Sequence, residues 1–106
     1  MEVISTWIKG LTIIQPRVFE DERGYFMESY QHSFFVENFP DIKFIQDNES
    51  KSSFGVLRGL HFQKPPFEQT KLVRVIKGKV LDVAVDLRQG SDTFGKHYSI
   101  ILSEEN

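Results

Sequence analysis

The chain has 106 residues, 40% of them hydrophobic, which suits a single globular domain with one hydrophobic core. Thirteen basic and fifteen acidic residues give a net charge of −2, and the basic residues are scattered, so general nucleic-acid binding through a basic face is not favoured. The absence of cysteine excludes a disulfide framework, a thiol nucleophile and a thiolate metal site.

The N-terminal residues contain neither a basic segment nor a long apolar one, so they do not resemble a secretion signal. No later stretch approaches the ~18 uninterrupted apolar residues of a membrane-spanning helix. We therefore expect one domain over residues 1–106 of a soluble, cytoplasmic protein.

The first predicted elements are two strands joined by a turn. Residues 8–19 alternate loosely between apolar and polar and are interrupted at Pro16. Residues 20–24 have the composition of a turn, with Gly24 suited to a positive φ angle. Residues 25–30 return as a strand that carries Phe26 and Glu28 on one face, because side chains alternate along a strand.

A short helix and a further strand follow. Residues 33–40 are predicted to form one or two helical turns, with Ser33 as the N-cap and Pro40 ending the helix. The strand at 42–48 has apolar residues first and then the amides Gln46 and Asn48 on the same face. This gradient is typical of a strand that runs from the core to a pocket.

The next predicted strand lies between a loop at 50–55 and a proline-stiffened loop at 64–68, and it contains Arg58 and His61. In a regular strand these two side chains point to opposite faces, because they are separated by an odd number of residues. A pocket lined by both therefore requires an irregular strand, and a bulge at Gly59 would provide it.

The C-terminal part is predicted to contain a tight β-hairpin, with strands at 71–76 and 79–87 around Lys77-Gly78. After a turn at 88–92, residues 97–102 form a last strand. Short strands separated by glycine and proline turns indicate an all-β sandwich or barrel with one short helix. Within the hairpin, one continuous apolar face consists of Leu81, Val83, Val85 and Leu87.

The candidate catalytic residue is His61, because histidine can take and return a proton near neutral pH. The alternative is a core histidine that is bonded to a backbone carbonyl. The nearby Arg58 offers a planar fork for phosphate oxygens, and Lys71 is a point charge suited to a developing oxyanion. Together these side chains suit a phosphorylated carbonyl substrate.

The alternatives for the other charged candidates are structural. Arg58 could form a buried ion pair with Asp82 or Asp86, and Lys71 could be a strand-end charge in solvent. Arg23 and Glu28 could likewise be only turn and rim residues. A metal site is disfavoured, because His61 has no companion histidine at a short ligand spacing.

As a whole, the pattern resembles the N-terminal part of the dTDP-4-dehydrorhamnose 3,5-epimerases. The resemblance covers nearly every residue of the chain. Its most specific motifs are, in chain order, FEDERGYFME at 19–28, FIQDN at 44–48, VLRGLHFQ at 56–63, KLVRV at 71–75 and DVAVDLR at 82–88.

The resemblance implies a cupin-like jelly-roll fold and a cofactor-independent epimerase in dTDP-L-rhamnose biosynthesis. Such an enzyme acts on dTDP-4-dehydro-6-deoxy-D-glucose and inverts C3 and C5 beside the C4 ketone. His61 matches the family's general base, and Lys71 is assigned to the sugar or enolate oxygen. The implied substrate-binding residues are Arg23 and Arg58 on the diphosphate side, together with Phe26, Glu28, Gln46, Asp47, Asn48, Gln63 and Lys71.

The resemblance also implies a homodimer in which N-terminal strands contribute to the neighbour's pocket. The family's chains continue past the position of Asn106, and that further part holds a tyrosine proton donor and the carboxylate that orients the base. We therefore expect this chain to be a truncated domain that is inactive by itself. Its missing strands would leave open sheet edges, so oligomerisation or poor solubility should follow.

Two alternative functions stay open at this point. Related enzymes invert a single carbon or move the ketone, and these residues do not separate them from a 3,5-epimerase. A non-catalytic fragment that binds nucleotide sugar or only dimerises would use the same Arg58, Gln46 and Asn48.

Overall fold

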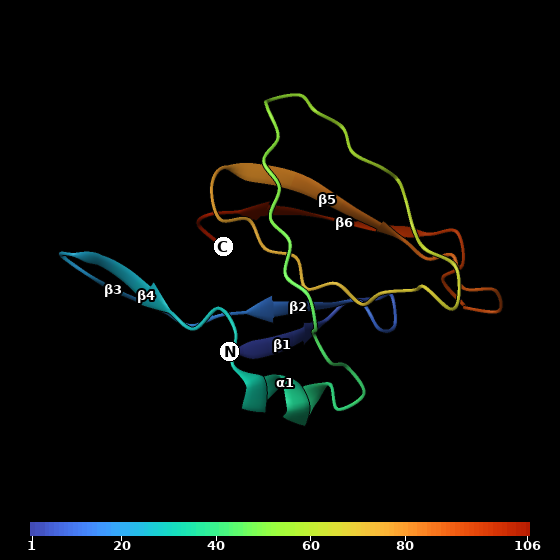
Figure 1. Ribbon diagram of the computed structural model, residues 1–106, viewed down its shortest axis with the longest axis horizontal. Coiled ribbons are helices and arrows are strands. Elements are labelled where there is room, and N and C mark those ends of the chain that lie inside the picture. The colour runs from blue at the N-terminus through green and yellow to red at the C-terminus, as the bar shows by residue number, and fades with distance from the viewer.

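The computed structural model describes residues 1–106 and is mostly β, with six strands in three separate antiparallel pairs and one short helix (Figure 1). Each pair is a two-stranded sheet of its own. The strands are β1 (Glu2–Ser5) with β2 (Thr12–Gln15), β3 (Val18–Asp21) with β4 (Gly24–Met27), and β5 (Lys79–Val85) with β6 (His97–Ser103).

The interruption predicted at Pro16 is confirmed, because β2 ends at Gln15 and β3 begins at Val18. The β3–β4 pair is a tight hairpin with Asp21 opposite Gly24, and Gly24 has the expected positive φ of 128°. Figure 1 shows this hairpin projecting away from the rest of the chain. We call residues 17–28 the arm.

Sequence reasoning missed β1, although Val3 and Ile4 are β-branched residues of the type enriched in strands. It also placed a strand from Ile8, where the structure has the turn between β1 and β2. The backbone N–H of Leu11 donates to the carbonyl of Ile8 there, and Ile8 is buried. The apolar Ile8 therefore belongs to a turn that is covered, not to a strand.

The helix α1 (His32–Asn38) is present, but the predicted N-cap is wrong. Gln31 is the N-cap and makes no side-chain capping bond, so Ser33 lies inside the first turn. Helix ends are hard to place within one or two residues from sequence. Pro40 follows the C-cap residue Phe39 directly, as a helix end requires. The chain contains no helix with the length and hydropathy that crossing a membrane requires.

An aromatic cluster formed by α1 and the residues on either side of it is the main hydrophobic contact of the chain. Phe35 is only 3% exposed, and its ring stacks on Tyr30 with centroids 4.8 Å apart. Phe44 meets Phe35 edge to face at 5.5 Å, so the residues after the helix fold back against it. Phe34 and Phe39 complete the cluster at 5.5 and 5.9 Å from Phe35.

The strands predicted at 42–48, around Arg58 and His61, and at 71–76 are wrong for this chain. Residues 43–77 form no strand and run as a long open arc (Figure 1). Their only mutual backbone hydrogen bonds close two local turns, from Val56 to Ser53 and from Phe67 to Lys64. A strand needs a hydrogen-bonded neighbour, and no segment of this chain supplies one. We call residues 43–77 the arc.

The predicted hairpin around Lys77-Gly78 is also wrong, because β5 pairs with β6 and not with residues 71–76. The alternation of apolar and polar residues that identified β5 is compatible with a paired strand on either edge. It therefore predicted the strand but not the strand with which β5 pairs. The carbonyl of Gly78 accepts from the backbone N–H of Glu104, which extends the β5–β6 pairing. The last strand, predicted at 97–102, is confirmed as β6.

A closed sandwich is not formed by these residues, because only Ile8, Phe35 and Asp86 are buried. Part of the apolar face predicted on β5 lies open, with Leu81 67% exposed. The radius of gyration is 15.4 Å, against about 13 Å for a compact domain of this length. The chain therefore has an extended shape with little interior.

One buried polar group organises the connection between β5 and β6. Asp86 is 4% exposed and follows β5 directly. Its Oδ1 accepts from the backbone N–H and Nε of Arg88 at 3.0 and 2.9 Å, and its Oδ2 accepts from Arg88 Nη2 at 2.9 Å. The hydroxyls of Ser91 and Thr93 also donate to Oδ2, both at 2.6 Å. We call this network the Asp86 clasp.

The backbone of Asp86 closes the same loop onto the start of β6. Its N–H donates to the carbonyl of Lys96 at 2.9 Å, and its carbonyl accepts from Gly95 at 2.7 Å. The Arg88 guanidinium, followed by the two hydroxyls, holds the pKa of Asp86 well below its usual range. In turn, Asp86 raises the pKa of Arg88.

We expect Phe35→Ala to destabilise the chain by about 3–5 kcal/mol, because truncating a buried aromatic residue loses its packing and leaves a cavity. Urea denaturation followed by circular dichroism measures the loss. Val36→Ala is the matched control, since Val36 is the next residue of α1 and is 49% exposed. An equal loss of stability in both variants would contradict the assigned role of Phe35.

We expect Asp86→Asn to lower the melting temperature at pH 7, because the neutral amide loses the charge-assisted bonds of the clasp. A carboxyl group whose pKa is lowered in the folded state stabilises it fully above the unfolded pKa of about 4. This contribution is lost as the pH falls from there toward the folded pKa. The difference in melting temperature between wild type and Asp86→Asn should therefore shrink below about pH 4. Asp92→Asn, an exposed acid in the same loop, should show no such difference.

Candidate functional site

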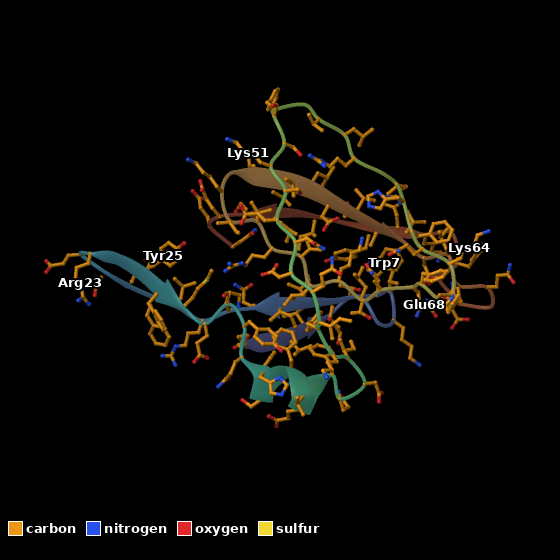
Figure 2. The ribbon with its side chains drawn as sticks, viewed as in Figure 1. Trp7, Arg23, Tyr25, Lys51, Lys64 and Glu68 are labelled. Atoms are coloured by element: carbon orange, nitrogen blue, oxygen red, sulfur yellow. The ribbon has the colours of Figure 1, made fainter.

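Arg23 lies at the tip of the arm, in the turn between β3 and β4 (Figure 2). Its Nη2 contacts Asp21 Oδ2 at 2.6 Å, its Nε contacts the same oxygen at 3.1 Å, and its backbone N–H donates to Oδ1 at 2.8 Å. Hydrogen bonds from Arg23 lower the pKa of Asp21, and Asp21 raises the pKa of Arg23. Because both side chains are exposed, this pair orients Arg23 more than it stabilises the fold.

Phe26 and Glu28 line one open recess of about 320 Å³, as their shared strand face predicts. The ring of Phe26 lies 6.5 Å from that of Phe19 across the β3–β4 pair. The guanidinium of Arg17 stands 4.8 Å from the centre of the Phe19 ring, a cation–π contact. Sequence reasoning missed Arg17, which directly precedes β3.

Gln46 Nε2 donates to Asn48 Oδ1 at 3.1 Å, so the two side chains are in contact although the strand predicted for them is not formed. Both amides and the intervening Asp47 are exposed. Further donors and acceptors of the two amides therefore remain available to a ligand.

Arg58 contacts the preceding loop and neither of the aspartates proposed as its alternative partner. Its Nε donates to Ser52 Oγ at 2.9 Å, and its Nη2 donates to the carbonyl of Lys51 at 3.2 Å. Asp86 instead forms its ion pair with Arg88, so the alternative of a buried ion pair between Arg58 and an aspartate is wrong. Sequence reasoning missed Ser52 and Lys51, which supply a hydroxyl and a backbone carbonyl to Arg58.

His61, Gln63 and Lys71 lie on the arc with exposed side chains. The alternative of a core histidine is therefore wrong for His61. Gly59 adopts a φ of 102°, and a Cβ at that position would lie 3.1 Å from His61 Nδ1. Glycine is thus required at 59, as the expected irregularity implies, although no ladder is present to make it a bulge.

The expected site residues fall into two groups that do not form one pocket within a single chain. Arg23, Phe26 and Glu28 belong to the arm, and the other expected residues belong to the arc. Figure 2 shows Arg23 at one end of the molecule, far from Lys51 and Lys64 of the arc. Residues 43–77 carry seven basic and three acidic side chains, in a chain whose net charge is −2. The arc is therefore the part that suits an anionic ligand.

Comparisons with known proteins identify what this arrangement is similar to. The family model described as dTDP-4-dehydrorhamnose 3,5-epimerase matches residues 5–106. Among curated proteins, the dTDP-4-dehydrorhamnose 3,5-epimerase of Methanothermobacter thermautotrophicus is 55% identical over 103 residues, which are 97% of this chain. The enzyme of the same name from Escherichia coli is 50% identical over 108 residues and covers 100% of the chain.

Solved structures give the same result. A dTDP-4-dehydrorhamnose 3,5-epimerase from Elizabethkingia anophelis matches 100% of this chain with a TM-score of 0.90 and 55% identity. A dTDP-6-deoxy-D-glucose-3,5-epimerase from Legionella pneumophila, in complex with dTDP-4-keto-L-rhamnose, matches 99% with a TM-score of 0.91 and 50% identity. The open arc therefore follows the path that the equivalent residues take in these structures.

The chain spans little more than half the length of these proteins. It covers 55% of the Methanothermobacter protein and 58% of the Escherichia coli protein. In the two structures it covers 58% and 56% of the solved chain.

Proposed function

Because the chain belongs to the dTDP-4-dehydrorhamnose 3,5-epimerase family, we propose that its protein inverts C3 and C5 of dTDP-4-dehydro-6-deoxy-D-glucose in dTDP-L-rhamnose biosynthesis. The observation that carries this proposal is the likeness to the Legionella structure, which holds a dTDP-linked keto sugar and matches 99% of the chain. The cytoplasmic location expected from the sequence is part of the same proposal.

In the proposed mechanism His61 is the general base. The C4 ketone acidifies the C–H bonds at C3 and C5, because the carbanion left by proton removal delocalises into an enolate. His61 removes the proton, and Lys71 stabilises the negative charge on the enolate oxygen. Inversion requires a proton donor on the opposite face of the sugar, and we assign that donor to residues beyond 106.

The arc is proposed to bind the diphosphate and the sugar. Arg58 is already oriented by Ser52 and the Lys51 carbonyl, so its planar guanidinium is available for phosphate oxygens. Gln46, Asp47, Asn48 and Gln63 are proposed to contact the nucleotide sugar. The surplus of basic residues on the arc raises the local concentration of a dianionic ligand.

The arm is proposed to complete the site of a second copy. Arg23, Phe26 and Glu28 are assigned to substrate binding, yet they lie away from Arg58 and His61 of the same chain. An exchange of arms in a homodimer would bring these two groups together. The Phe19–Phe26 pair with Arg17 offers an aromatic and cationic surface for a nucleobase.

We further propose that residues 1–106 are part of a cupin-like jelly roll that segments outside this range complete. The arc has the backbone path of the solved relatives but lacks hydrogen-bonded neighbours, and apolar residues of β5 lie open. Strands from the remaining length of the protein would pair with the arc and cover this surface.

The catalytic assignment is tested in a chimera that joins residues 1–106 to the remaining segment of the Escherichia coli relative. In D2O we expect deuterium to enter the substrate at both C3 and C5, measured by NMR. His61→Ala should lower the rate by about 10²–10⁴-fold, because general base catalysis contributes that much. His32→Ala is the matched control, since His32 is an exposed histidine of α1, and it should leave the rate unchanged.

Other results identify the alternative functions. Deuterium at one carbon only, or a product with the ketone moved from C4, would replace the proposal with a single-carbon epimerase or a ketoisomerase. Binding of dTDP without any deuterium uptake in the chimera would favour a non-catalytic module. An unchanged rate in His61→Ala would remove His61 as the base.

The exchange of arms is tested by mixing two variants. We expect Arg58→Ala and Phe26→Ala chains each to bind dTDP at least about tenfold more weakly, measured by calorimetry, because each loses a charge-assisted or stacking contact. In a mixed dimer with exchanged arms, one site combines an intact Arg58 with an intact Phe26. Mixing should therefore restore wild-type affinity at one site per mixed dimer. If the arm binds within its own chain, no combination restores a site.

A further inference from the structure

A second recess, of about 450 Å³, lies between the β1–β2 turn and the β5–β6 connection. Trp7 is its only hydrophobic lining residue, and the others are polar residues and one glycine. None of the site residues expected from the sequence lines it. The recess is therefore polar, with a single aromatic side chain on one side.

The aromatic wall is an indole that remains open to solvent. Trp7 is 54% exposed, which is unusual for the largest apolar side chain. Its ring centroid lies 6.1 Å from that of Tyr98 on β6, at an interplanar angle of 56°. Tyr98 therefore supports Trp7 from one side, and Figure 2 shows Trp7 in the right half of the molecule, inward of Glu68 and Lys64.

The opposite wall is rigid because of the Asp86 clasp. Arg88 is fixed through Nε and Nη2, while its Nη1 lies beside the backbone of Gly10, where an added Cβ would be 3.6 Å away. Ser91 and Thr93 are held by the same carboxylate. A wall that is ordered before a ligand arrives reduces the entropic cost of binding.

The charges around the recess balance. Lys9 and Asp92 are the remaining charged lining residues, and the charge of Arg88 is neutralised by Asp86. Both Lys9 and Asp92 are exposed and form no ion pair, and the amide of Gln89 also faces the recess. A net anion or cation therefore has no electrostatic advantage here, whereas a neutral ligand with several hydroxyls has donors and acceptors to meet.

We propose that this recess binds a neutral pyranose sugar. One face of a pyranose ring presents C–H groups that can lie on the Trp7 indole, which is apolar on its face. The ring hydroxyls would then meet Lys9, Gln89 and Asp92, which supply a donor, an amide and an acceptor. This proposal is independent of the function proposed above.

The single tryptophan of the chain makes the recess directly observable. We titrate the 106-residue chain with the methyl pyranosides of glucose, galactose and mannose and record Trp7 fluorescence. At least one should give a saturating change with half-saturation on the order of millimolar, since a monosaccharide offers few atoms for binding. The indole Nε1–H signal of Trp7 should shift along the same curve in the NMR spectrum.

Variants then separate the recess from a general solvent effect. Asp92→Ala and Gln89→Ala should each raise the half-saturation concentration at least about fivefold. Glu105→Ala, outside the recess, should not change it. Both recess residues are exposed, so these variants should keep the fold, and dispersed amide signals in the NMR spectrum verify this.

Three outcomes would overturn the proposal. The first is a fluorescence change that stays linear in sugar concentration. The second is saturation by inorganic phosphate with none by the sugars, which would assign the recess to an anion. The third is a chain without dispersed amide signals, because the recess would then not exist in solution.

Discussion

Backbone hydrogen bonding is the constraint on which the rest of this structure depends. Every buried N–H and C=O group needs a partner, and residues 43–77 have almost none among themselves or with the rest of the chain. The chain makes 31 backbone–backbone hydrogen bonds, against ~70 for a typical globular chain of this length. An arc without partners must stay exposed, and it leaves the neighbouring sheets without a common interior.

The exposed apolar residues and the large radius of gyration follow from the same constraint. Yet the backbone agrees with complete family structures over the full chain, with a TM-score of 0.90 for the Elizabethkingia protein. The extended shape is therefore that of the matching part of this longer solved chain. The proposed catalytic residues His61 and Lys71 lie on the arc, which is the part of this chain with the fewest backbone hydrogen bonds.

How much of the structure was predictable from sequence depends on how local each signal is. The break at Pro16, the positive φ of Gly24 and the strand at 97–102 were predicted correctly, because proline, glycine and a short alternation act within a few residues. The helix was found but its cap was misplaced. The strands of the arc were not formed, because pairing is decided by residues distant in the sequence.

In the candidate site, too, local features could be predicted from the sequence and long-range features could not. The shared face of Phe26 and Glu28 follows from the strand period, and both residues line one recess. The strand predicted for Gln46 and Asn48 is not formed, and these two side chains meet through a hydrogen bond instead. The contact of Arg58 with Ser52 was not predicted, because a loop conformation decides it. Sequence motifs identified the family, but they could not show that the arm and the arc lie apart within one chain.

The Asp86 clasp has a consequence for how the protein is made. All its contacts lie within residues 86–96, and the strands that it joins are neighbours in the sequence, so the β5–β6 ribbon forms with little loss of loop entropy. During synthesis this ribbon can assemble as soon as β6 has left the ribosome. The β5–β6 ribbon is therefore the part of the chain whose formation depends least on residues distant in the sequence.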